Sequence, residues 1–311
     1  MRAFLGIVLL FVAACSPRFT NNYLSIPEGE LDDFLSYREE NTVPLVSAHR
    51  GGGEYTGFPE NAIQSFEYIL RYTPAIIECD VAMTKDSVLI LMHDNTLNRT
   101  TTCAGEVKQT TWSEIQTCYL EDNKGRETPF RVPLYEDVLR WAKGKTVLTV
   151  DVKRGVPFER IVENIEKYGA ESYAAVITYN LADAKKVFEL NPNLMISMNI
   201  GNEEQLQNAL SAGIPAKNII AFTGTRQPSP ELNQQLHKLD IMTIFGTLGG
   251  LDEKAEALSK KKAQTLYRQC VEEGVDILAT DRPIEASRAI RKLVPRKSEQ
   301  LRYFTPRKTN K

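Results

Sequence analysis

The feature that most constrains the fold is a regular alternation, from residue 44 onward, of short β-branched runs with longer helical patterns. Eight such runs occur along the chain. This alternation is typical of a parallel sheet built from strand–helix units, and the number of runs predicts an α/β fold, the closed (β/α)8 TIM barrel. The predicted strands are 44–49, 75–82, 146–152, 174–179, 194–200, 219–223, 241–245 and 277–281.

The segments between the strands predict the helices of the barrel. The predicted helices are 61–72, 135–143, 157–168, 181–190, 203–212, 230–239, 262–273 and one after Pro283. A doubly wound open sheet is the competing architecture, but no glycine-rich dinucleotide fingerprint follows the first strand. Because one barrel commonly takes about 200–250 residues, we expect a single large domain at 43–293. A hairpin strand at 88–92 and a turn-rich stretch at 94–132 predict a small insertion after the second strand, packed over the mouth of the barrel.

The N-terminus predicts export. Arg2 precedes an apolar run, 3–14, that is too short to span a bilayer. Val12-Ala13-Ala14-Cys15 resembles the bacterial lipobox, in which residues 1–14 are removed as a signal peptide and Cys15 is lipid-modified. The alternative is an ordinary secretory signal with a chance cysteine. Acyl chains on Cys15 would tether the domain to a bacterial membrane, on its periplasmic or cell-surface side.

Two terminal segments are predicted to lie outside the barrel. Residues 16–42 are polar and lack a sustained apolar period, so we expect a spacer in which only 31–37 could form a short helix. Residues 294–311 form a basic tail that we expect to be solvated. The formal net charge of −2 gives the chain no electrostatic reason to bind nucleic acid.

Export would permit disulfide bonds among the cysteines that remain after Cys15. Cys103 and Cys118 are predicted to pair, because they lie 15 residues apart in the turn-rich insertion. Closing a loop of that length contributes about 3 kcal/mol in the chain-entropy model. Cys79 and Cys270 are predicted to be small buried hydrophobic residues.

Residues suited to the cleavage of a phosphate ester gather at or just beyond the predicted strand ends, where active sites of this fold lie. They include two of the chain's three histidines. The set offers acid/base groups, metal ligands and a positively charged group that could bind an anion. Its members are His49, Arg50, Glu60, Glu78, Asp80, His93, Asp151 and Lys153.

Three of the four carboxylates in this set are expected to converge. Successive strand residues point to opposite faces, so Glu78 and Asp80 share one face, and Asp151 lies on the neighbouring strand. Crowding three negative charges is unfavourable without a cation, and an all-oxygen ligand set suits Ca²⁺ or Mg²⁺ better than Zn²⁺. The alternative is a structural ion-pair network in which Lys153 neutralises one carboxylate.

The remaining candidates also have structural alternatives. His49 could be a structural histidine at a strand end, with its ring nitrogens hydrogen-bonded within the fold. His93 could be a turn histidine that donates a hydrogen bond to Asp94. The planar fork of Arg50 suits phosphate oxygens, but it could equally bind a carboxylate at the barrel mouth. Glu60, in Pro59-Glu60-Asn61, either belongs to a helix start or acts in catalysis. His237 is predicted to be an exposed surface residue without a role.

Five motifs in this order resemble the glycerophosphodiester phosphodiesterase family over residues 43–293, a family with a (β/α)8 barrel and a small insertion after the second strand. They are His49-Arg50-Gly51, Pro59-Glu60-Asn61, Glu78-Cys79-Asp80, His93-Asp94 and Thr280-Asp281-Arg282-Pro283.

The resemblance implies that His49 and His93 are the general acid and base, and that Glu78 and Asp80 bind a divalent cation. It also implies that Arg50 contacts the phosphate, with Lys153 adding positive charge. Asp151 stands where the family usually has a longer glutamate as third metal ligand. Phe245-Gly246-Thr247 stands where the family often has a tryptophan.

The function implied by the resemblance is the hydrolysis of glycerophosphodiesters to glycerol 3-phosphate and an alcohol such as choline, ethanolamine or glycerol. One divalent cation would be required, and export favours Ca²⁺ over Mg²⁺. One alternative is a phosphodiesterase for lysophospholipids or phosphoinositides on the same barrel. Another is a non-catalytic surface lipoprotein that binds phosphorylated ligands or sugars.

Overall fold

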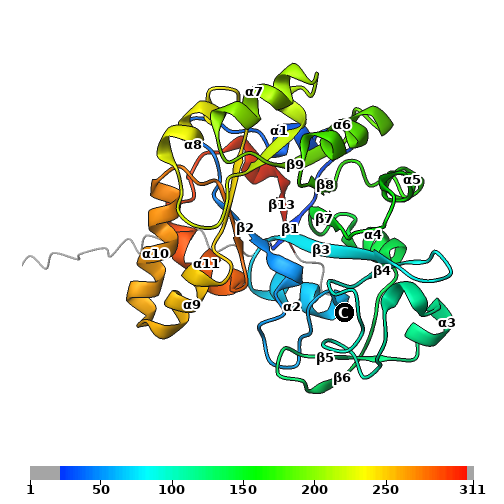
Figure 1. The fold of residues 1–311 in the computed structure, drawn as a ribbon. Helices are drawn as coiled ribbons and strands as arrows, with labels where there is room; N and C mark the ends of the chain where they lie inside the picture. Colours follow the sequence, from blue (N-terminus) through cyan, green and yellow to red (C-terminus); the bar gives the residue numbers. More distant parts are fainter. Residues whose placement is uncertain (1–21, 307–311) are drawn as a thin grey trace, which may run out of the picture.

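The computed structural model describes residues 22–306, so the predicted signal peptide, Cys15 and residues 307–311 lie outside it. Within this range, eight parallel strands form a closed barrel in the order β2, β12, β11, β10, β9, β8, β7 and β3, with β3 pairing back to β2 (Figure 1). The predicted TIM barrel is confirmed. Its strands are β2 (Leu45–Ala48), β3 (Ile76–Met83), β7 (Leu148–Val152), β8 (Ala174–Thr178), β9 (Met195–Asn199), β10 (Ile219–Phe222), β11 (Thr243–Gly246) and β12 (Ile277–Thr280).

Helices surround the barrel where the helical patterns predict them. They are α2 (Ile63–Tyr72), α4 (Tyr135–Ala142), α5 (Phe158–Lys167), α6 (Leu181–Leu190), α7 (Glu203–Ser211), α8 (Pro230–His237), α10 (Lys260–Glu272) and α11 (Pro283–Ile290). One further helix, α9 (Gly250–Ala257), was not predicted, because it begins with glycine and buries the charged residue Asp252 in place of an apolar stripe. Short 3-10 turns complete the chain at η1 (His49–Gly51), η2 (Val107–Gln109), η3 (Ala216–Asn218), η4 (Arg291–Leu293) and η5 (Glu299–Tyr303).

The alternation of side chains along the strands divides the core into two parts. Outward residues such as Ile77 and Cys79 pack beneath the helices. Inward residues near the strand starts, such as Leu45 and Ile76, fill the lower barrel with apolar side chains. Inward residues near the ends of β3 and β7 are polar, as at Glu78. The barrel interior therefore changes from an apolar bottom to a mouth that carries charged groups.

Both ends of the described chain close the bottom of the barrel. Strand β1 (Tyr23–Leu24) pairs antiparallel with β13 (Phe304–Thr305), and helix α1 (Leu31–Phe34) packs beside them. Leu24 and Phe34 are fully buried in the same apolar cluster as Tyr303. The predictions of a spacer at 16–42 and of a solvated tail at 294–311 are therefore wrong for their described residues, because both segments bury apolar side chains against the barrel.

The third histidine belongs to the same lower region. The His237 side chain is only 13% exposed, and its Nε2 lies 2.9 Å from Asp276 Oδ2. The ring of Tyr37, from the segment that follows α1, stacks on the His237 ring with centroids 3.6 Å apart. The prediction of an exposed surface histidine is therefore wrong, because an N-terminal segment covers this helix end.

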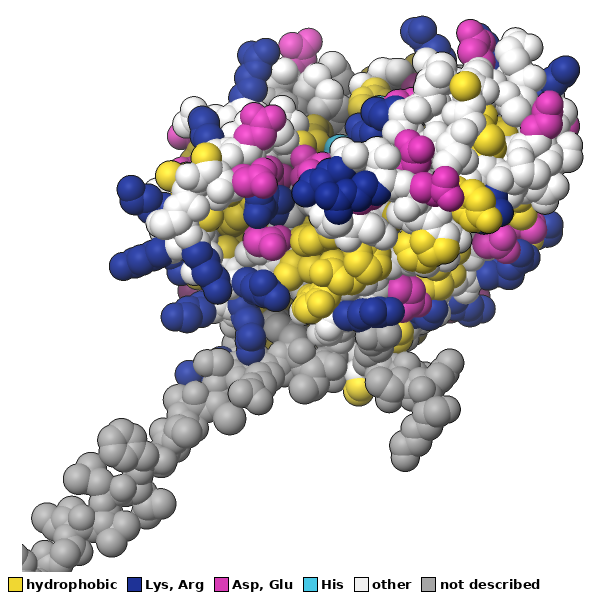
Figure 2. All heavy atoms as spheres, turned by 90° about the horizontal axis from the view of Figure 1, so that it is seen from below, with side chains coloured by type: hydrophobic (Ala, Val, Ile, Leu, Met, Phe, Trp, Pro, Cys, Tyr) yellow, Lys and Arg dark blue, Asp and Glu magenta, His cyan; other side chains and the backbone are white. Residues whose placement is uncertain are grey.

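The outer surface mixes charges of both signs. Figure 2 shows Lys and Arg side chains interspersed with Asp and Glu side chains, around hydrophobic side chains gathered near the centre of this face. Among residues 22–306, none of the helices is both long enough and apolar enough to cross a bilayer.

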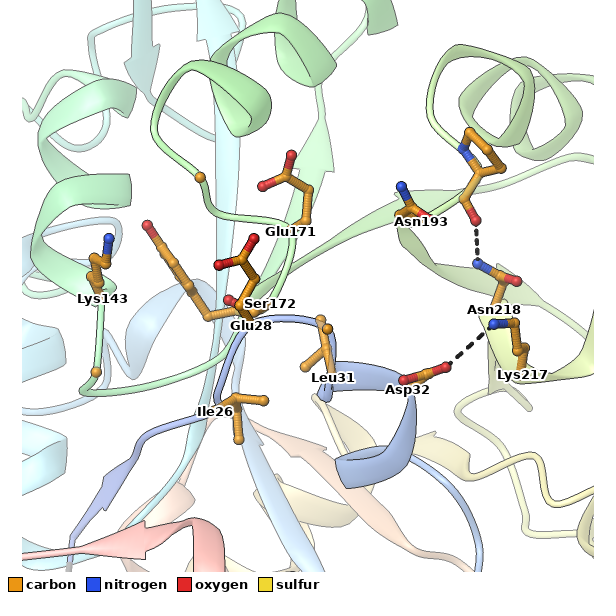
Figure 3. Close-up of a pocket in the computed structure, with 15 residues that line it drawn as sticks. Ile26, Glu28, Leu31, Asp32, Lys143, Glu171, Ser172, Asn193, Lys217 and Asn218 are labelled. Carbon is orange, nitrogen blue, oxygen red and sulfur yellow. Dashed lines mark hydrogen bonds and ion pairs between the residues drawn. The ribbon is translucent and has the colours of Figure 1, made fainter.

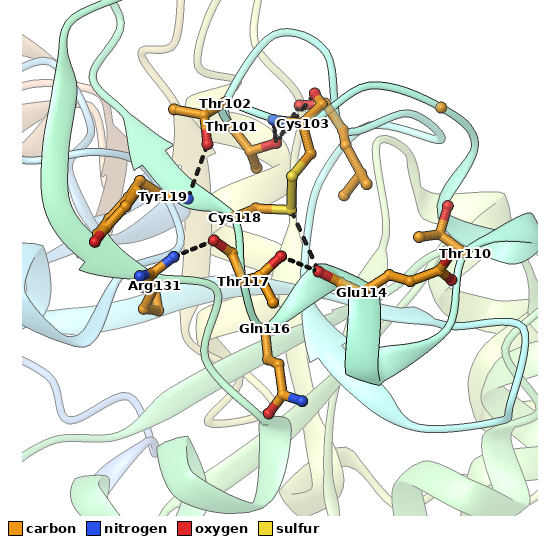
Figure 4. The surroundings of a disulfide bond; sticks show 12 residues. Thr101, Thr102, Cys103, Thr110, Glu114, Gln116, Thr117, Cys118, Tyr119 and Arg131 are labelled. Carbon is orange, nitrogen blue, oxygen red and sulfur yellow. Dashed lines mark hydrogen bonds between the residues drawn. A yellow bond between two sulfur atoms is a disulfide. The ribbon is translucent and has the colours of Figure 1, made fainter.

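The predicted insertion has a small core of its own. It contains β4 (Leu89–Leu91), α3 (Trp112–Ile115) and the hairpin of β5 (Tyr119–Glu121) with β6 (Glu127–Arg131). The predicted Cys103–Cys118 disulfide is present and joins the loop after β4 to the start of β5 (Figure 4). Cys79 and Cys270 are free and buried, as predicted. Gly57 N donates to Asp122 Oδ2 at 2.9 Å, so the insertion packs against the loop that follows β2.

Candidate active site

A cavity of about 280 Å³ opens at the carboxyl ends of the barrel strands. The structure brings six of the predicted site residues into its lining, while Arg50 contacts Glu78 of this group and Glu60 contacts Arg50. The six residues come from β3, from β7 and from the loops that follow β2, β4 and β7. They are His49, Glu78, Asp80, His93, Asp151 and Lys153.

Three buried carboxylates meet on one side of the cavity. Glu78, Asp80 and Asp151 each place an oxygen within 4.8 Å of the other two. The register of the parallel strands causes this convergence, because Asp80 on β3 lies directly opposite Asp151 on β7. The Lys153 ammonium lies 2.9 Å from Asp80 Oδ1 and 2.9 Å from Asp151 Oδ2. The ion-pair network considered as the alternative is thus present, but one lysine faces three carboxylates.

The electrostatics of this group suit a bound cation. Burial, together with the negative charge of Asp80, raises the pKa of Glu78 to about 8. Burial raises the pKa of Asp80 as well, but Lys153 and Asn61 outweigh it and lower the value overall. No donor among the described residues bonds the buried Oδ1 of Asp151. An uncompensated carboxylate and an unpaired oxygen in an all-oxygen group fit a hard divalent cation.

His49 is held by a carboxylate from the last strand of the barrel. Its Nδ1 lies 2.6 Å from Asp281 Oδ1, just beyond β12. Burial lowers the pKa of His49, but the hydrogen bond with Asp281 and the negative charges of Glu78 and Asp281 together outweigh it, so the net shift is upward. Asp281 is held in turn, since its backbone N–H donates to buried Asp252. Asp281 was predicted only as part of a motif, and no sequence pattern indicated a role for Asp252.

His93 has a partner on each ring nitrogen. Its Nδ1 lies 2.7 Å from Asp94 Oδ1, which is the contact expected for a turn histidine. Its Nε2 lies 2.8 Å from Arg50 Nη2. Since an ionised carboxylate only accepts and a guanidinium only donates, the proton of the neutral ring belongs on Nδ1. Nε2 is then the atom of His93 that can exchange a proton at the cavity.

Arg50 lies in a tight turn that packs on α2. Its backbone φ is 50°, its N–H donates to Glu78 Oε2 at 2.6 Å, and its Nη1 lies 3.2 Å from Glu60 Oε2. The predicted alternative of a contact with a mouth carboxylate is therefore realised. Gly51 follows with φ of 71°, and a Cβ there would lie 1.9 Å from the Phe66 ring. Glycine is required at this position so that the turn can pack on α2.

Two further residues belong to the site, of which Asn61 was predicted only as part of a motif and Arg99 was not predicted at all. Asn61 has φ of 57°, donates to Asp80 Oδ2 at 2.7 Å and accepts from Asp80 N at 2.9 Å, so it fixes the central carboxylate. Arg99, in the insertion, bonds both Glu60 and Asp94. An arginine in a turn-rich stretch is most often a solvated charge, and the contacts of Arg99 depend on how the insertion packs.

The wall opposite the carboxylates is largely apolar. It is formed by side chains from β8, β10 and β11 and from the loop after β11. They include Ile177, Phe222, Ile244 and Leu248. The cavity therefore offers charged groups on one side and apolar contact on the other.

A larger cavity of about 480 Å³ lies at the opposite end of the barrel, beside α1 (Figure 3). Its charged groups partly pair with each other, as Lys217 does with Asp32 at 3.6 Å. The Asn218 side chain donates to the Pro192 carbonyl at 2.9 Å. No histidine of residues 22–306 lines this cavity, so it lacks the histidine acid/base groups of the mouth, and the carboxylate group that could hold a metal ion is the one at the mouth.

Comparison with known proteins points to one family. The sequence model described as the glycerophosphoryl diester phosphodiesterase family matches residues 49–244. The chain is also similar to the crystal structure of a glycerophosphoryl diester phosphodiesterase from Parabacteroides distasonis ATCC 8503. The two are 37% identical with a TM-score of 0.86, and the match covers 92% of this chain and 99% of that one.

More distant solved structures share the fold. A phosphodiesterase from Oleispira antarctica, solved in complex with the product sn-glycerol-3-phosphate, is 17% identical with a TM-score of 0.61. That match covers 80% of this chain and 97% of the other.

Curated relatives match over shorter stretches. A glycerophosphodiester phosphodiesterase of Caldanaerobacter subterraneus subsp. tengcongensis is 30% identical over 161 residues, which is 50% of this chain and 65% of that protein. Protein YqiK of Bacillus subtilis is 34% identical over 142 residues, which is 43% of this chain and 58% of that protein. The chain thus spans about three fifths of the length of these relatives.

Proposed function

The chain belongs to the glycerophosphoryl diester phosphodiesterase family, and we propose that it hydrolyses glycerophosphodiesters to glycerol 3-phosphate and an alcohol. One observation carries the proposal: a single cavity holds two histidines, each with Nδ1 bound by a carboxylate, beside a buried acidic triad. Each histidine would therefore exchange protons through Nε2, which in His93 also accepts from Arg50 Nη2. This pairing supports general acid/base cleavage of a phosphodiester.

The two histidines divide the proton transfers in the proposed reaction. One takes a proton from the nucleophile, which is water or the glycerol hydroxyl of the substrate, and the other protonates the leaving alkoxide. Arg50 and Lys153 lie next to the triad and would bind the phosphate oxygens. Glu60 orients Arg50 through its contact with Nη1.

The acidic triad would hold one divalent cation through oxygens of Glu78, Asp80 and Asp151. When bound, the cation supplies positive charge that polarises a phosphoryl oxygen. We favour Ca²⁺ over Mg²⁺, because Ca²⁺ tolerates the irregular geometry that a lysine within the ligand group imposes.

The cavity and one solved structure support the proposed substrate. The complex of the Oleispira antarctica phosphodiesterase with sn-glycerol-3-phosphate supports the same product here. The leaving alcohol would be choline, ethanolamine or glycerol. A second candidate substrate is a lysophospholipid or phosphoinositide, which is favoured by the apolar wall around Phe222 and Leu248.

The location of the protein is a separate proposal that rests on the lipobox alone. We propose that the chain is exported and anchored to a bacterial membrane by lipid on Cys15. A Cys15→Ser variant should then appear in the soluble fraction of cells, whereas the wild type should partition with membranes. Membrane retention of the variant would contradict the anchor.

A substrate panel tests the proposed activity. The chain that begins after Cys15 is offered glycerophosphocholine, lysophosphatidylcholine and glycerophosphoinositol, each with Ca²⁺, Mg²⁺ or a chelator. We expect release of glycerol 3-phosphate from the first, with activity lost in chelator and restored by the ion. Absence of turnover with every substrate and ion would refute the proposed activity. Full activity in chelator would refute the proposed metal site.

A further inference from the structure

Five side chains at the mouth form a closed ring of hydrogen bonds. Arg99 bonds Asp94, Asp94 bonds His93 Nδ1, and His93 Nε2 contacts Arg50. Arg50 bonds Glu60, which returns to Arg99. His93 and Arg50 belong to the proposed catalytic and phosphate-binding groups, but Arg99 comes from the insertion.

Arg99 binds both carboxylates of this ring. Its Nε and Nη2 lie 2.7 and 2.9 Å from the two oxygens of Asp94. Its Nη1 and Nη2 lie 2.9 and 2.8 Å from the two oxygens of Glu60. Both contacts are bidentate, which fixes the plane of each carboxylate and not only its position. A lysine could not reproduce this geometry, because it offers a single nitrogen.

The two carboxylates need Arg99 in this arrangement. Glu60 is 4% exposed and Asp94 27% exposed, so solvent compensates little of the charge of Glu60. The Arg99 guanidinium, more than any other group, holds the pKa of Asp94 well below its usual range. Arg99 thus keeps Asp94 ionised and its plane fixed, and an ionised Asp94 can only accept from His93 Nδ1.

The main chain around Arg99 is well anchored. Leu97, Thr100 and Thr101 are buried, and Thr101 N donates to Leu97 O at 3.1 Å. The Thr100 carbonyl accepts from Glu121 N at 2.8 Å, which ties this turn to β5. The Cys103–Cys118 disulfide closes the same loop. The insertion therefore presents Arg99 to the mouth from a fixed turn.

We propose that Arg99 is a positioning residue of the reaction: through Asp94 it sets the tautomer of His93, and through Glu60 it aims Arg50 at the substrate phosphate. This inference rests on the proposed phosphodiesterase function. It gives the insertion a direct part in the active site, although Arg99 itself touches no substrate.

Substitutions of Arg99 in the full chain test the proposal. Arg99→Met removes every N–H contact while keeping an unbranched side chain of similar length, and we expect kcat to fall by about 10-fold to 10²-fold through misplacement of His93 and Arg50. Arg99→Lys keeps the charge and should recover part of the loss. The matched control is Arg131→Met, which removes another arginine of the insertion that stacks on Tyr119 and should leave kcat unchanged.

The tautomer of His93 gives a readout that a merely structural role would not move. Long-range ¹H–¹⁵N NMR distinguishes Nδ1–H from Nε2–H rings, and a His93→Gln variant identifies the signal among the three histidines. We expect the Nδ1–H form in the wild type and a mixture or the Nε2–H form in Arg99→Met. Should Arg99→Met fail to fold, Arg99→Lys is judged by the same two measurements.

The outcomes separate this proposal from the proposed function. An active wild type with an Arg99 variant that keeps both its kcat and the Nδ1–H tautomer would overturn the positioning role. A fall in kcat without a change in the tautomer of His93 would also overturn the proposal, because the proposal says that Arg99 sets this tautomer. An inactive wild type would refute the proposed function, while the NMR comparison would still decide whether Arg99 sets the tautomer of His93.

Discussion

The two ends of the barrel are built from the same eight strands but differ in what they bury, which is an apolar cluster at the bottom and a group of three carboxylates at the mouth. At the bottom, buried Gln300 donates to Phe34 O and accepts from Val43 N, both at 2.7 Å, within an apolar cluster. At the mouth, the carboxylates of Glu78 and Asp151 are buried beside Asp80 and lack full compensation.

This contrast assigns stability to one end and chemistry to the other. Crowded buried carboxylates oppose folding, because desolvation and mutual repulsion both raise the free energy of the folded state. Apolar burial elsewhere in the molecule must offset that cost, and the closed bottom is one source of it. Variants at one end should therefore change stability, and variants at the other should change turnover.

The largest effect is expected at the bottom, from Phe34→Ala. Phe34 is fully buried, and its ring packs edge-on against Tyr303 with centroids 5.3 Å apart. Truncation should lower the free energy of unfolding by about 3–5 kcal/mol. Urea unfolding measures this loss, and kcat of the folded fraction should stay unchanged. A large fall in kcat would show that the two ends are coupled.

The next effect compares the three histidines of the chain. His49→Ala and His93→Ala should each lower kcat by about 10²-fold or more, because each removes a general acid or base. Their melting temperatures should stay close to that of the wild type. His237→Ala is the matched control at the bottom, where the lost contact with Asp276 should lower the melting temperature and leave kcat intact. Near-normal kcat in both mouth variants would refute the acid/base assignment.

A smaller effect at the mouth is an increase in stability. Because the pKa of Glu78 is raised to about 8, the folded protein holds this carboxyl in its neutral form. The stability that this neutral form gives the folded state is complete below pH of about 4.5 and is lost as pH rises through about 8. In metal-free protein, Glu78→Gln should remove this loss and raise the melting temperature at pH 9 by about 5 °C. Calorimetry with chelator at pH 5 and pH 9 checks the difference. If the melting temperatures of the wild type and of Glu78→Gln changed equally between pH 5 and pH 9, this prediction would be wrong.

The smallest effect is a shift in the pH profile. The hydrogen bond with Asp281 helps to hold the pKa of His49 above its ordinary value despite burial, so Asp281→Asn should lower that pKa. The limb of the kcat/KM profile that belongs to His49 should then move to lower pH. Movement of the acidic limb would identify His49 as the base, and movement of the basic limb would identify it as the acid. A profile with both limbs unmoved would mean that His49 does not limit the reaction.

Much of the fold was predictable because its signals are local. A β-branched run followed by a helical period marks each strand–helix unit, so all eight strands were placed to within a few residues. The errors fall on segments whose structure depends on distant partners. Helix α9 has no apolar stripe, and β1 exists only because β13, from the other end of the chain, pairs with it.

The sequence by itself determined which residues stand at the strand ends, and hence that His49, Glu78, Asp80, His93 and Asp151 would share one mouth. Strand alternation and the parallel direction of the strands are enough for that conclusion. Only the tertiary structure decided what holds them there. Asp281 reaches His49 across 232 residues, and Arg99 reaches Glu60 from the insertion. Such contacts depend on loop packing and side-chain direction, which no local period encodes.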